Sequence, residues 1–473
     1  MKLNYSIFRL VTYVAIALPI AIGSLFCTLG HASQSLIDRN ALIQIDKDMD
    51  GNNALNWNEL PRNTNPGDGG SWAGVDWTRS SPERVSVIYA SQIGLTGAST
   101  GWSALTSLKR LDLSYNQITD AGVVSLSTLT GLKILCLSGN QITSVDNLGT
   151  LTALQSLFLT YNHISRVDSL GTLTGLQILD LLGNKITSVE SLGTLTALTY
   201  LNLSINQISS VDGLGTLTSL TDLNLSGNQI TSVDGLGSLT ALTHLDLSGI
   251  QITDAGAVSL GTLTGLQVLN LSSNQLSRVD SLGTLTALEV LDLSGNQISS
   301  VDSLGTLTAL TYLNLSGNRL TRADMFPTGI YRSGSSLNVD GNALPLSQLY
   351  PHMGISNLSL GQQHNVTFSA FTGDMSPGIP YDLSSESAFG GKATVFRITL
   401  ANGDVATSGV HYVESNGVIT FLIPGNYIVS MTNEAIYSKG DLGGEDFETI
   451  SNNYGEVQPL VVVNTGTLSV FDR

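Results

Sequence analysis

The stretch LNLSGNQIT at residues 223–231 recurs, with small changes, along most of the chain. LDLSGNQIS occupies residues 291–299, and LNLSGNRLT occupies residues 313–321. Aligned on the asparagine, successive copies are 22 residues apart, except for three steps of 24 residues. The asparagines at this position are Asn116, Asn140, Asn162, Asn184, Asn206, Asn228, Asn274, Asn296, Asn318 and Asn342. A regular repeat of this length predicts a solenoid, in which each unit packs against its neighbours.

The leucines of each copy predict one short β-strand. Alternate side chains of a strand point to opposite faces, so Leu223 and Leu225 should point inward and Asn224 outward. One copy cannot bury its own leucines, but stacked copies bury them in a continuous core. The segment at residues 210–220 is too short for a long helix. We therefore expect an α/β solenoid with parallel strands on the concave face and short 3₁₀ or helical turns on the convex face.

The asparagine after each strand is expected to hold the turn that follows. The chain bends inward there, and an amide side chain can both donate to and accept from the buried backbone. Ile250 replaces this asparagine in one copy, and Ile93 stands at the same place after the first strand. Isoleucine forms no side-chain hydrogen bond, and each buried group left unpaired costs about 1–3 kcal/mol. We expect Asn228 and Asn274 to hold the turns beside Ile250, and the alternative is a hinge or a ligand notch.

The unit LxxLxLxxNxIxxVxxLGxLTx is the leucine-rich repeat, and its length resembles the bacterial internalin-like class. The resemblance implies 3₁₀ turns on the convex side and binding of host or cell-surface proteins. We assign the repeat array to residues 85–344. Residues 33–84 resemble the N-terminal cap of extracellular leucine-rich repeat proteins, with Trp57, Trp72 and Trp77 as core residues of the cap.

The remaining C-terminal residues predict a separate all-β domain. Residues 345–355 read as a linker, and residues 356–473 as a β-sandwich, because short runs of alternating apolar residues lie between turn signals. The stretch GVITFLIPGNYIVSMTN at residues 417–433 predicts two strands around a Pro-Gly turn. It resembles the immunoglobulin-like modules that follow leucine-rich repeats in bacterial surface proteins, although the Cys…Trp…Cys core is lacking.

Residues 1–32 read as a secretory signal peptide. Lys2 and Arg9 precede an apolar run, and small residues before a cut after Ala32 suit the signal peptidase. The alternative is an uncleaved membrane anchor. Cleavage leaves Cys136 as the one remaining cysteine, so the mature chain has no internal disulfide. We therefore expect a secreted or cell-surface protein.

The composition is acidic and restricts the class of partner. The chain has 37 Asp and Glu residues against 20 Lys and Arg, and its net charge is −17. The basic surface of a nucleic-acid-binding protein is absent, and phosphate or anionic lipid would be repelled. A protein or peptide partner is therefore expected to be neutral or basic. The sequence contains no zinc-protease motif, phosphate-binding loop or CxxC pair, so we expect no enzyme.

Outward strand positions supply the candidate binding residues. Apolar and aromatic side chains gather where the copies depart from the repeat, and Cys136 is also expected to face outward there. The predicted partner-binding residues are Ile134, Phe158, Tyr161, Ile178, Tyr200, Asp222, His244 and Tyr312. Aromatic side chains in polar surroundings are typical of binding hot spots. We expect a protein or peptide on the concave face, and the alternative is a carbohydrate- or matrix-binding adhesin whose C-terminal domain binds while the solenoid is a stalk.

Two groups of acids are candidate cation sites. One acid begins each back turn, at Asp146, Asp168, Glu190, Asp212, Asp234, Asp280 and Asp302. We expect these carboxylates to cap free N–H groups, with a row of cation sites as the alternative. DKDMDG at residues 46–51 resembles the opening of an EF-hand calcium loop, with Asp46, Asp48, Asp50 and Glu59 as possible ligands. Glu59 comes two residues later than the motif requires, so a plain turn is the alternative.

Overall fold

The computed structural model divides the chain into two compact units, residues 1–136 and 137–473, which are described one at a time. It describes residues 36–49, 75–77, 84–323, 326–344, 352, 355, 357–359, 380–382, 388–389, 392–393, 395–400, 405–408, 412–415, 418–421, 426–432 and 463–464. The predicted signal peptide lies outside these residues. Within them, no helix combines the length and the apolar character that crossing a membrane requires.

The first unit joins a helical cap to the first parallel strands. Its elements are α2 (Leu36–Met49), β1 (Val75–Trp77), β2 (Val85–Tyr89), η1 (Thr100–Ala104), β3 (Arg110–Asp112), α3 (Asp120–Leu126) and β4 (Ile134–Cys136). Strands β2, β3 and β4 are parallel, and β1 pairs with β2 in antiparallel fashion. The buried carboxylate of Asp38 on α2 forms an ion pair with Arg84 at 2.7 Å and accepts the N–H of Val85. The cap helix is therefore bound directly to the start of β2.

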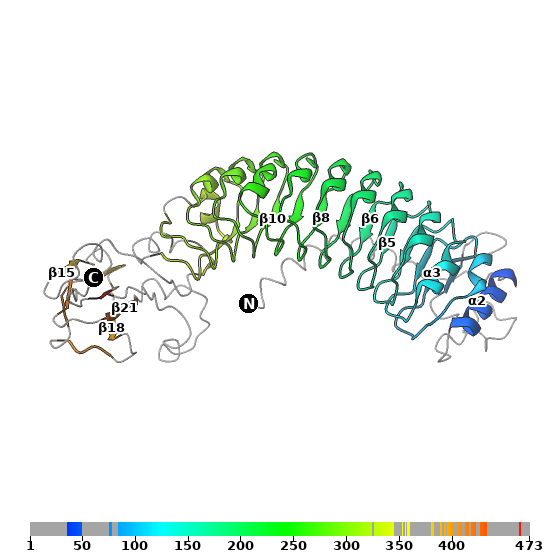
Figure 1. Cartoon of the computed structure of the whole chain (residues 1–473), viewed down its shortest axis with the longest axis horizontal. Coiled ribbons are helices and arrows are strands. Elements are labelled where there is room, and N and C mark those ends of the chain that lie inside the picture. Colours follow the sequence, from blue (N-terminus) through cyan, green and yellow to red (C-terminus); the bar gives the residue numbers. More distant parts are fainter. Residues whose placement is uncertain are drawn as a thin grey trace, which may run out of the picture. The chain divides into compact units, whose positions relative to one another are not determined.

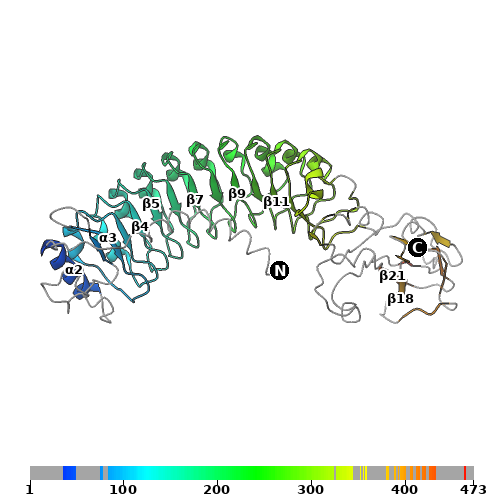
Figure 2. The same cartoon turned by 180° about the vertical axis from the view of Figure 1, so that it is seen from behind.

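The second unit continues with ten parallel strands in sequence order. They are β5 (Ser156–Phe158), β6 (Ile178–Asp180), β7 (Tyr200–Asn202), β8 (Asp222–Asn224), β9 (His244–Asp246), β10 (Val268–Asn270), β11 (Val290–Asp292), β12 (Tyr312–Asn314), β13 (Ser336–Asn338) and β14 (Asn357–Ser359). Leu223 and Leu225 are buried, as the alternation predicts, and the same holds for the equivalent leucines. Figures 1 and 2 show these repeats stacked side by side, with the short helices along the outer edge of the stack.

Short 3₁₀ helices form the back of the second unit, as predicted. They are η2 (Asp146–Thr150), η3 (Asp168–Thr172), η4 (Glu190–Thr194), η5 (Asp212–Thr216), η6 (Asp234–Leu236), η7 (Ala255–Thr262), η8 (Asp280–Thr284), η9 (Asp302–Thr306) and η10 (Thr328–Tyr331). A glycine near the end of each regular turn lies very close to the next repeat. A Cβ on Gly193, for example, would be 2.4 Å from the carbonyl oxygen of Gly213. Backbone therefore packs on backbone along this edge.

The predicted asparagine ladder is confirmed. The Asn206 side chain donates to the carbonyl oxygens of Leu181 and Leu203, both at 3.0 Å, and its Oδ1 accepts the N–H of Ile186 at 3.0 Å. The other asparagines from Asn162 to Asn342 occupy equivalent buried positions. Each one thus joins its own turn to the preceding repeat.

The neighbouring repeat compensates in part for Ile250. The Oδ1 of Asn274 accepts the N–H groups of both Ile250, at 3.3 Å, and Ile252, at 3.0 Å. In the first unit, Asn116 does the same for Ile93 and Leu95. The expectation that the following asparagine holds the turn is therefore confirmed, and these contacts give no indication of a hinge or notch.

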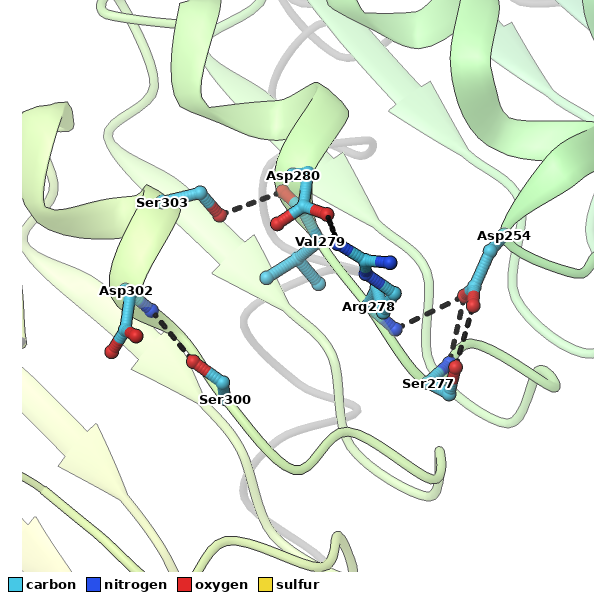
Figure 3. Close-up of polar contacts among 8 residues, drawn as sticks. All are labelled: Asp254, Ser277, Arg278, Val279, Asp280, Ser300, Asp302 and Ser303. Carbon is cyan, nitrogen blue, oxygen red and sulfur yellow. Dashed lines mark hydrogen bonds and ion pairs between the residues drawn. The ribbon is translucent and has the colours of Figure 1, made fainter.

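The prediction that the column of acids caps the back turns is wrong. In four repeats a serine two residues before the acid accepts the acid's N–H; Ser300 accepts from Asp302 at 3.3 Å (Figure 3). The acid is the first residue of the helix and its side chain is exposed. Where arginine replaces that serine, Arg278 forms an ion pair with Asp280 at 2.7 Å. A serine hydroxyl, and not the carboxylate, thus accepts an N–H at the start of these turns.

Asp254, in contrast to these acids, uses its carboxylate to bind backbone N–H groups. It lies in one of the 24-residue copies, and its side chain accepts the N–H groups of Ser277 at 2.8 Å and Arg278 at 3.0 Å (Figure 3). Its partners belong to the following repeat, so this acid joins two repeats.

Parallel pairing extends beyond residue 344, where the repeat array was expected to end, because β14 pairs with β13. Further along, the described strands are β15 (Pro380–Asp382), β16 (Ala388–Phe389), β17 (Lys392–Ala393), β18 (Val395–Leu400), β19 (Tyr412–Ser415), β20 (Val418–Phe421), β21 (Asn426–Thr432) and β22 (Val463–Asn464). They form three antiparallel groups, β15-β20-β19, β16-β17 and β18-β21-β22. The two strands around the Pro-Gly turn, β20 and β21, belong to different groups. The immunoglobulin-like sandwich stays a prediction.

Candidate binding surface on the strand face

Four of the predicted binding residues form one continuous row on the second unit. We call the outward side chains of β5 to β12 the strand face. Ile178 is paired in register with Tyr200, Tyr200 with Asp222, and Asp222 with His244. All four side chains are half-buried. Neighbouring strands are about 4.8 Å apart, so this row places an apolar, an aromatic and two ionisable groups side by side.

The other predicted residues lie at different distances from this row. Phe158 lies at the end of β5, paired with Asp180, and is half-buried. Tyr161 follows that strand and is 51% exposed. Tyr312 lies three strands beyond His244. Ile134 is a half-buried residue of β4 and belongs to the first unit.

Each tyrosine of the strand face lies beside an aspartate. Burial, the neighbouring charges of Asp180 and Asp222, and a hydrogen bond with Asn202 act on Tyr200, and its pKa is raised overall. Burial and the charge of Asp292 raise the pKa of Tyr312 to about 12. Both phenols therefore keep their protons at neutral pH and can donate hydrogen bonds to a partner.

His244 and Asp222 pair with each other. The Nδ1 atom of His244 lies 3.2 Å from a carboxylate oxygen of Asp222. Thr221 donates to the other carboxylate oxygen at 2.6 Å, and the hydroxyl of Thr243 lies 2.9 Å from the same Nδ1. Two residues that were predicted separately thus form one polar cluster.

The strand face is acidic. It carries Asp180, Asp222, Asp246 and Asp292, whereas none of the strands β5 to β12, all of which the structure describes, contains a lysine or arginine. Its one basic side chain is His244, which lies beside Asp222. The field of this surface therefore favours cationic groups.

The sequence profile described as a leucine-rich repeat region matches residues 108–325. These residues are a leucine-rich repeat region. No curated protein matches the sequence.

Solved structures with similar folds include bacterial and plant proteins. An internalin from Listeria monocytogenes is 28% identical with a TM-score of 0.55, and the match covers 59% of this chain and 80% of that chain. A leucine-rich repeat protein of Leptospira interrogans is 29% identical with a TM-score of 0.50, covering 54% and 66%. The ectodomain of a membrane receptor kinase from Arabidopsis thaliana is 25% identical with a TM-score of 0.57, covering 71% and 42%. The leucine-rich repeat region is therefore internalin-like.

Asp180 should make the stability of the leucine-rich repeat region depend on pH. Burial raises the pKa of its carboxyl to about 6, although hydrogen bonds from Leu182 and Asn202 oppose the shift. A carboxyl whose pKa is raised by folding makes the fold less stable as the pH rises from about 4 to about 6. Asp180→Asn should therefore raise the free energy of unfolding by about 1–2 kcal/mol at pH 7.5.

Urea denaturation of both proteins at pH 7.5 and at pH 4 measures this effect. The advantage of Asp180→Asn should shrink at the lower pH, where Asp180 is protonated in the folded chain. An advantage that stayed the same at both pH values would mean that ionisation of Asp180 is not its cause.

Cys136 is not placed for nucleophilic chemistry. It lies at an outward strand position as expected, but the side chain is buried, and burial raises the pKa of its thiol to about 12. The thiolate, which is the reactive form, is therefore scarce at neutral pH.

The calcium prediction concerns residues that the structure describes only in part. Asp46 and Asp48 lie in the last turn of α2, and Asp48 accepts hydrogen bonds from Ser99 and Gln44, both at 2.7 Å. Asp50 and Glu59 lie outside the described residues. No group of three or more potential metal ligands occurs within the described part of the chain. The calcium site stays a prediction.

Sequence reasoning missed two apolar residues near the strand face. Ile205 is 57% exposed, and Leu182 is half-buried. Both follow a strand, whereas the sequence analysis compared strand positions and added Tyr161 alone from the turns. The sequence does distinguish these two residues, because Leu182 and Ile205 replace the usual Ser and Gly of the LSGN segment.

Proposed function

We propose that the protein is an exported binding protein that holds a neutral or basic protein or peptide on the strand face. The observation that carries this proposal is the row from Ile178 to His244, in which apolar, aromatic and acidic groups are adjacent in register. Aromatic side chains supply contact area, and the acids select against acidic partners.

Rigidity supports the same proposal. Each strand is joined to the next by backbone hydrogen bonds, and each turn is fixed by an asparagine such as Asn206. Side chains on such a surface lose little further conformational entropy when a partner binds. The tyrosines also offer protonated hydroxyl groups.

Similar proteins also favour binding. The structure of the Arabidopsis receptor kinase ectodomain is a complex with Casparian strip integrity factor 2. The signal peptide at residues 1–32 would deliver the chain to the cell exterior, and the C-terminal β-domain would serve as a spacer.

The test uses the mature chain, residues 33–473, as bait for a displayed library of random 12-residue peptides. Peptides that bind should be enriched in lysine or arginine. In the double variant Phe158→Ala/Tyr200→Ala, the affinity for these peptides should fall about 30-fold, which corresponds to about 2 kcal/mol.

The control is Arg166→Ala/Asp168→Ala, which removes an exposed ion pair of the back turn. It should bind like the unmodified chain. Equal affinity of the strand-face variant would contradict the proposal, and would favour binding by another part of the chain such as the C-terminal domain.

A further inference from the structure

The residue before each ladder position, whether that position holds asparagine or Ile250, adopts a left-handed backbone conformation. In the second unit this residue is glycine in seven copies, Gly139, Gly183, Gly227, Gly249, Gly295, Gly317 and Gly341, with φ between 64° and 69°. Three copies carry a side chain there instead: Tyr161 (φ 52°), Ile205 (φ 54°) and Ser273 (φ 56°). A bulky or β-branched residue in this conformation is strained, because its Cβ crowds the backbone. Tyr161 and Ile205 thus oppose local stability.

Both side chains also expose apolar surface. Tyr161 is 51% exposed and Ile205 is 57% exposed. Their backbones are nevertheless fixed, because Tyr161 N–H donates to Leu182 O and Ile205 N–H donates to Ser226 O, both at 2.8 Å. Neither side chain is buried in the core, so core packing does not explain why Tyr161 and Ile205 replace glycine.

The side chains of Tyr161 and Ile205 each lie near a glycine of the following repeat. A Cβ on Gly183 would lie 2.7 Å from Cδ1 of Tyr161, so the tyrosine ring lies close to the Gly183 backbone. A Cβ on Gly227 would lie 3.6 Å from Cγ1 of Ile205. Each exposed side chain thus lies near the glycine backbone of the following repeat.

Two further apolar residues occur in the same three repeats. Phe158 replaces the Asn or Asp that ends each strand from β6 to β12, and Leu182 replaces the usual Ser or Thr. We call Phe158, Tyr161, Leu182 and Ile205 the turn patch. In the repeats of β8 to β12, the equivalent positions are all polar or glycine. The patch borders Asp180, which pairs with Phe158 in register.

We propose that the turn patch receives the apolar side chains of the partner, and that the partner is a polypeptide segment in which apolar residues alternate with lysine or arginine. This inference rests on the proposed function and adds the class of partner to it. The apolar groups of such a segment contact the turn patch, while its cations lie over two acids of the strand face, Asp180 beside the patch and Asp222 in the row that contains Tyr200. Charge complementarity selects this partner over an acidic one.

The test restores glycine at the two strained positions in the mature chain. Tyr161→Gly/Ile205→Gly should raise the midpoint of urea unfolding, because the strain is relieved. The matched control, Ser273→Gly, relieves the same strain outside the turn patch and should also raise the midpoint. Stability and binding should therefore change in opposite directions in the double variant alone.

Binding is measured with three synthetic heptapeptides that alternate lysine with leucine, lysine with serine, or glutamate with leucine. The unmodified chain and Ser273→Gly should bind the lysine-leucine peptide about tenfold more tightly than the lysine-serine peptide. The double variant should bind both lysine peptides equally. The glutamate-leucine peptide should bind the weakest.

Each contrary result has a distinct meaning. An undiminished preference of the double variant for leucine would overturn the turn patch and leave the strand-face proposal standing. A lower unfolding midpoint in the double variant would show that Tyr161 and Ile205 stabilise the fold, which removes the argument for binding. Tighter binding of the glutamate peptide would overturn the basic partner. Failure to bind any heptapeptide would overturn the alternating partner, whereas failure to bind the library peptides as well would overturn both proposals.

Discussion

Asn206→Ala should lower the free energy of unfolding by about 2–3 kcal/mol, a large effect for one polar side chain. The buried N–H of Ile186 would lose its acceptor, the Oδ1 of Asn206, and such an unpaired group costs about 1–3 kcal/mol. The carbonyl oxygens of Leu181 and Leu203 would each lose one of two amide donors, since Asn184 and Asn228 also bind them. Guanidinium denaturation followed by circular dichroism measures the loss.

Two further variants check that the ladder is the cause. Asn147→Ala changes an exposed asparagine of η2 and should alter stability by less than about 0.5 kcal/mol. Ile250→Asn restores the ladder where it is interrupted and should raise stability by about 1 kcal/mol, because Ile230 would regain the acceptor that Ile208 has in Asn228. Equal losses for Asn206→Ala and Asn147→Ala would contradict this account.

Repeat spacing made the core and the ladder predictable from sequence. A fixed period gives each position one environment, so the pattern around Leu223 and Leu225 fixes which side chains point inward. The same alignment also predicts the pairing of His244 with Asp222, because equivalent residues of successive copies become neighbours. That pairing was missed because each residue was considered singly.

The role of the acids that begin the back turns could not be predicted from the sequence, because two nearby groups can each accept a hydrogen bond. At the start of η9, both Ser300 and Asp302 carry an oxygen that could accept a free N–H, and a sequence pattern does not rank them. In the structure the acceptor is Ser300, whose hydroxyl accepts the N–H of Asp302 itself. The strain at Ile205 was hidden for a related reason, since a left-handed backbone is visible only in the dihedral angles.

The close stacking of the back turns, which no sequence pattern revealed, carries a second strong prediction. Gly193→Ala should lower the free energy of unfolding by about 3 kcal/mol, although alanine normally favours a helical turn over glycine. The added Cβ would lie 2.4 Å from the carbonyl oxygen of Gly213, and the atom it meets is backbone that cannot rotate away. To accept it, η4 and η5 would have to separate, and overpacking of this kind costs about 1–3 kcal/mol or more.

Gly175→Ala is the matched control, because the same methyl group there would be 3.8 Å from its nearest neighbour, the carbonyl oxygen of Leu154. Its stability should stay within about 1 kcal/mol of the unmodified chain. Guanidinium denaturation of the two alanine variants, side by side, separates the effect of contact from that of glycine flexibility. If Gly193→Ala were as stable as Gly175→Ala, η4 and η5 would be able to separate at little cost. The strand face that these turns support would then be less rigid than the binding proposal requires.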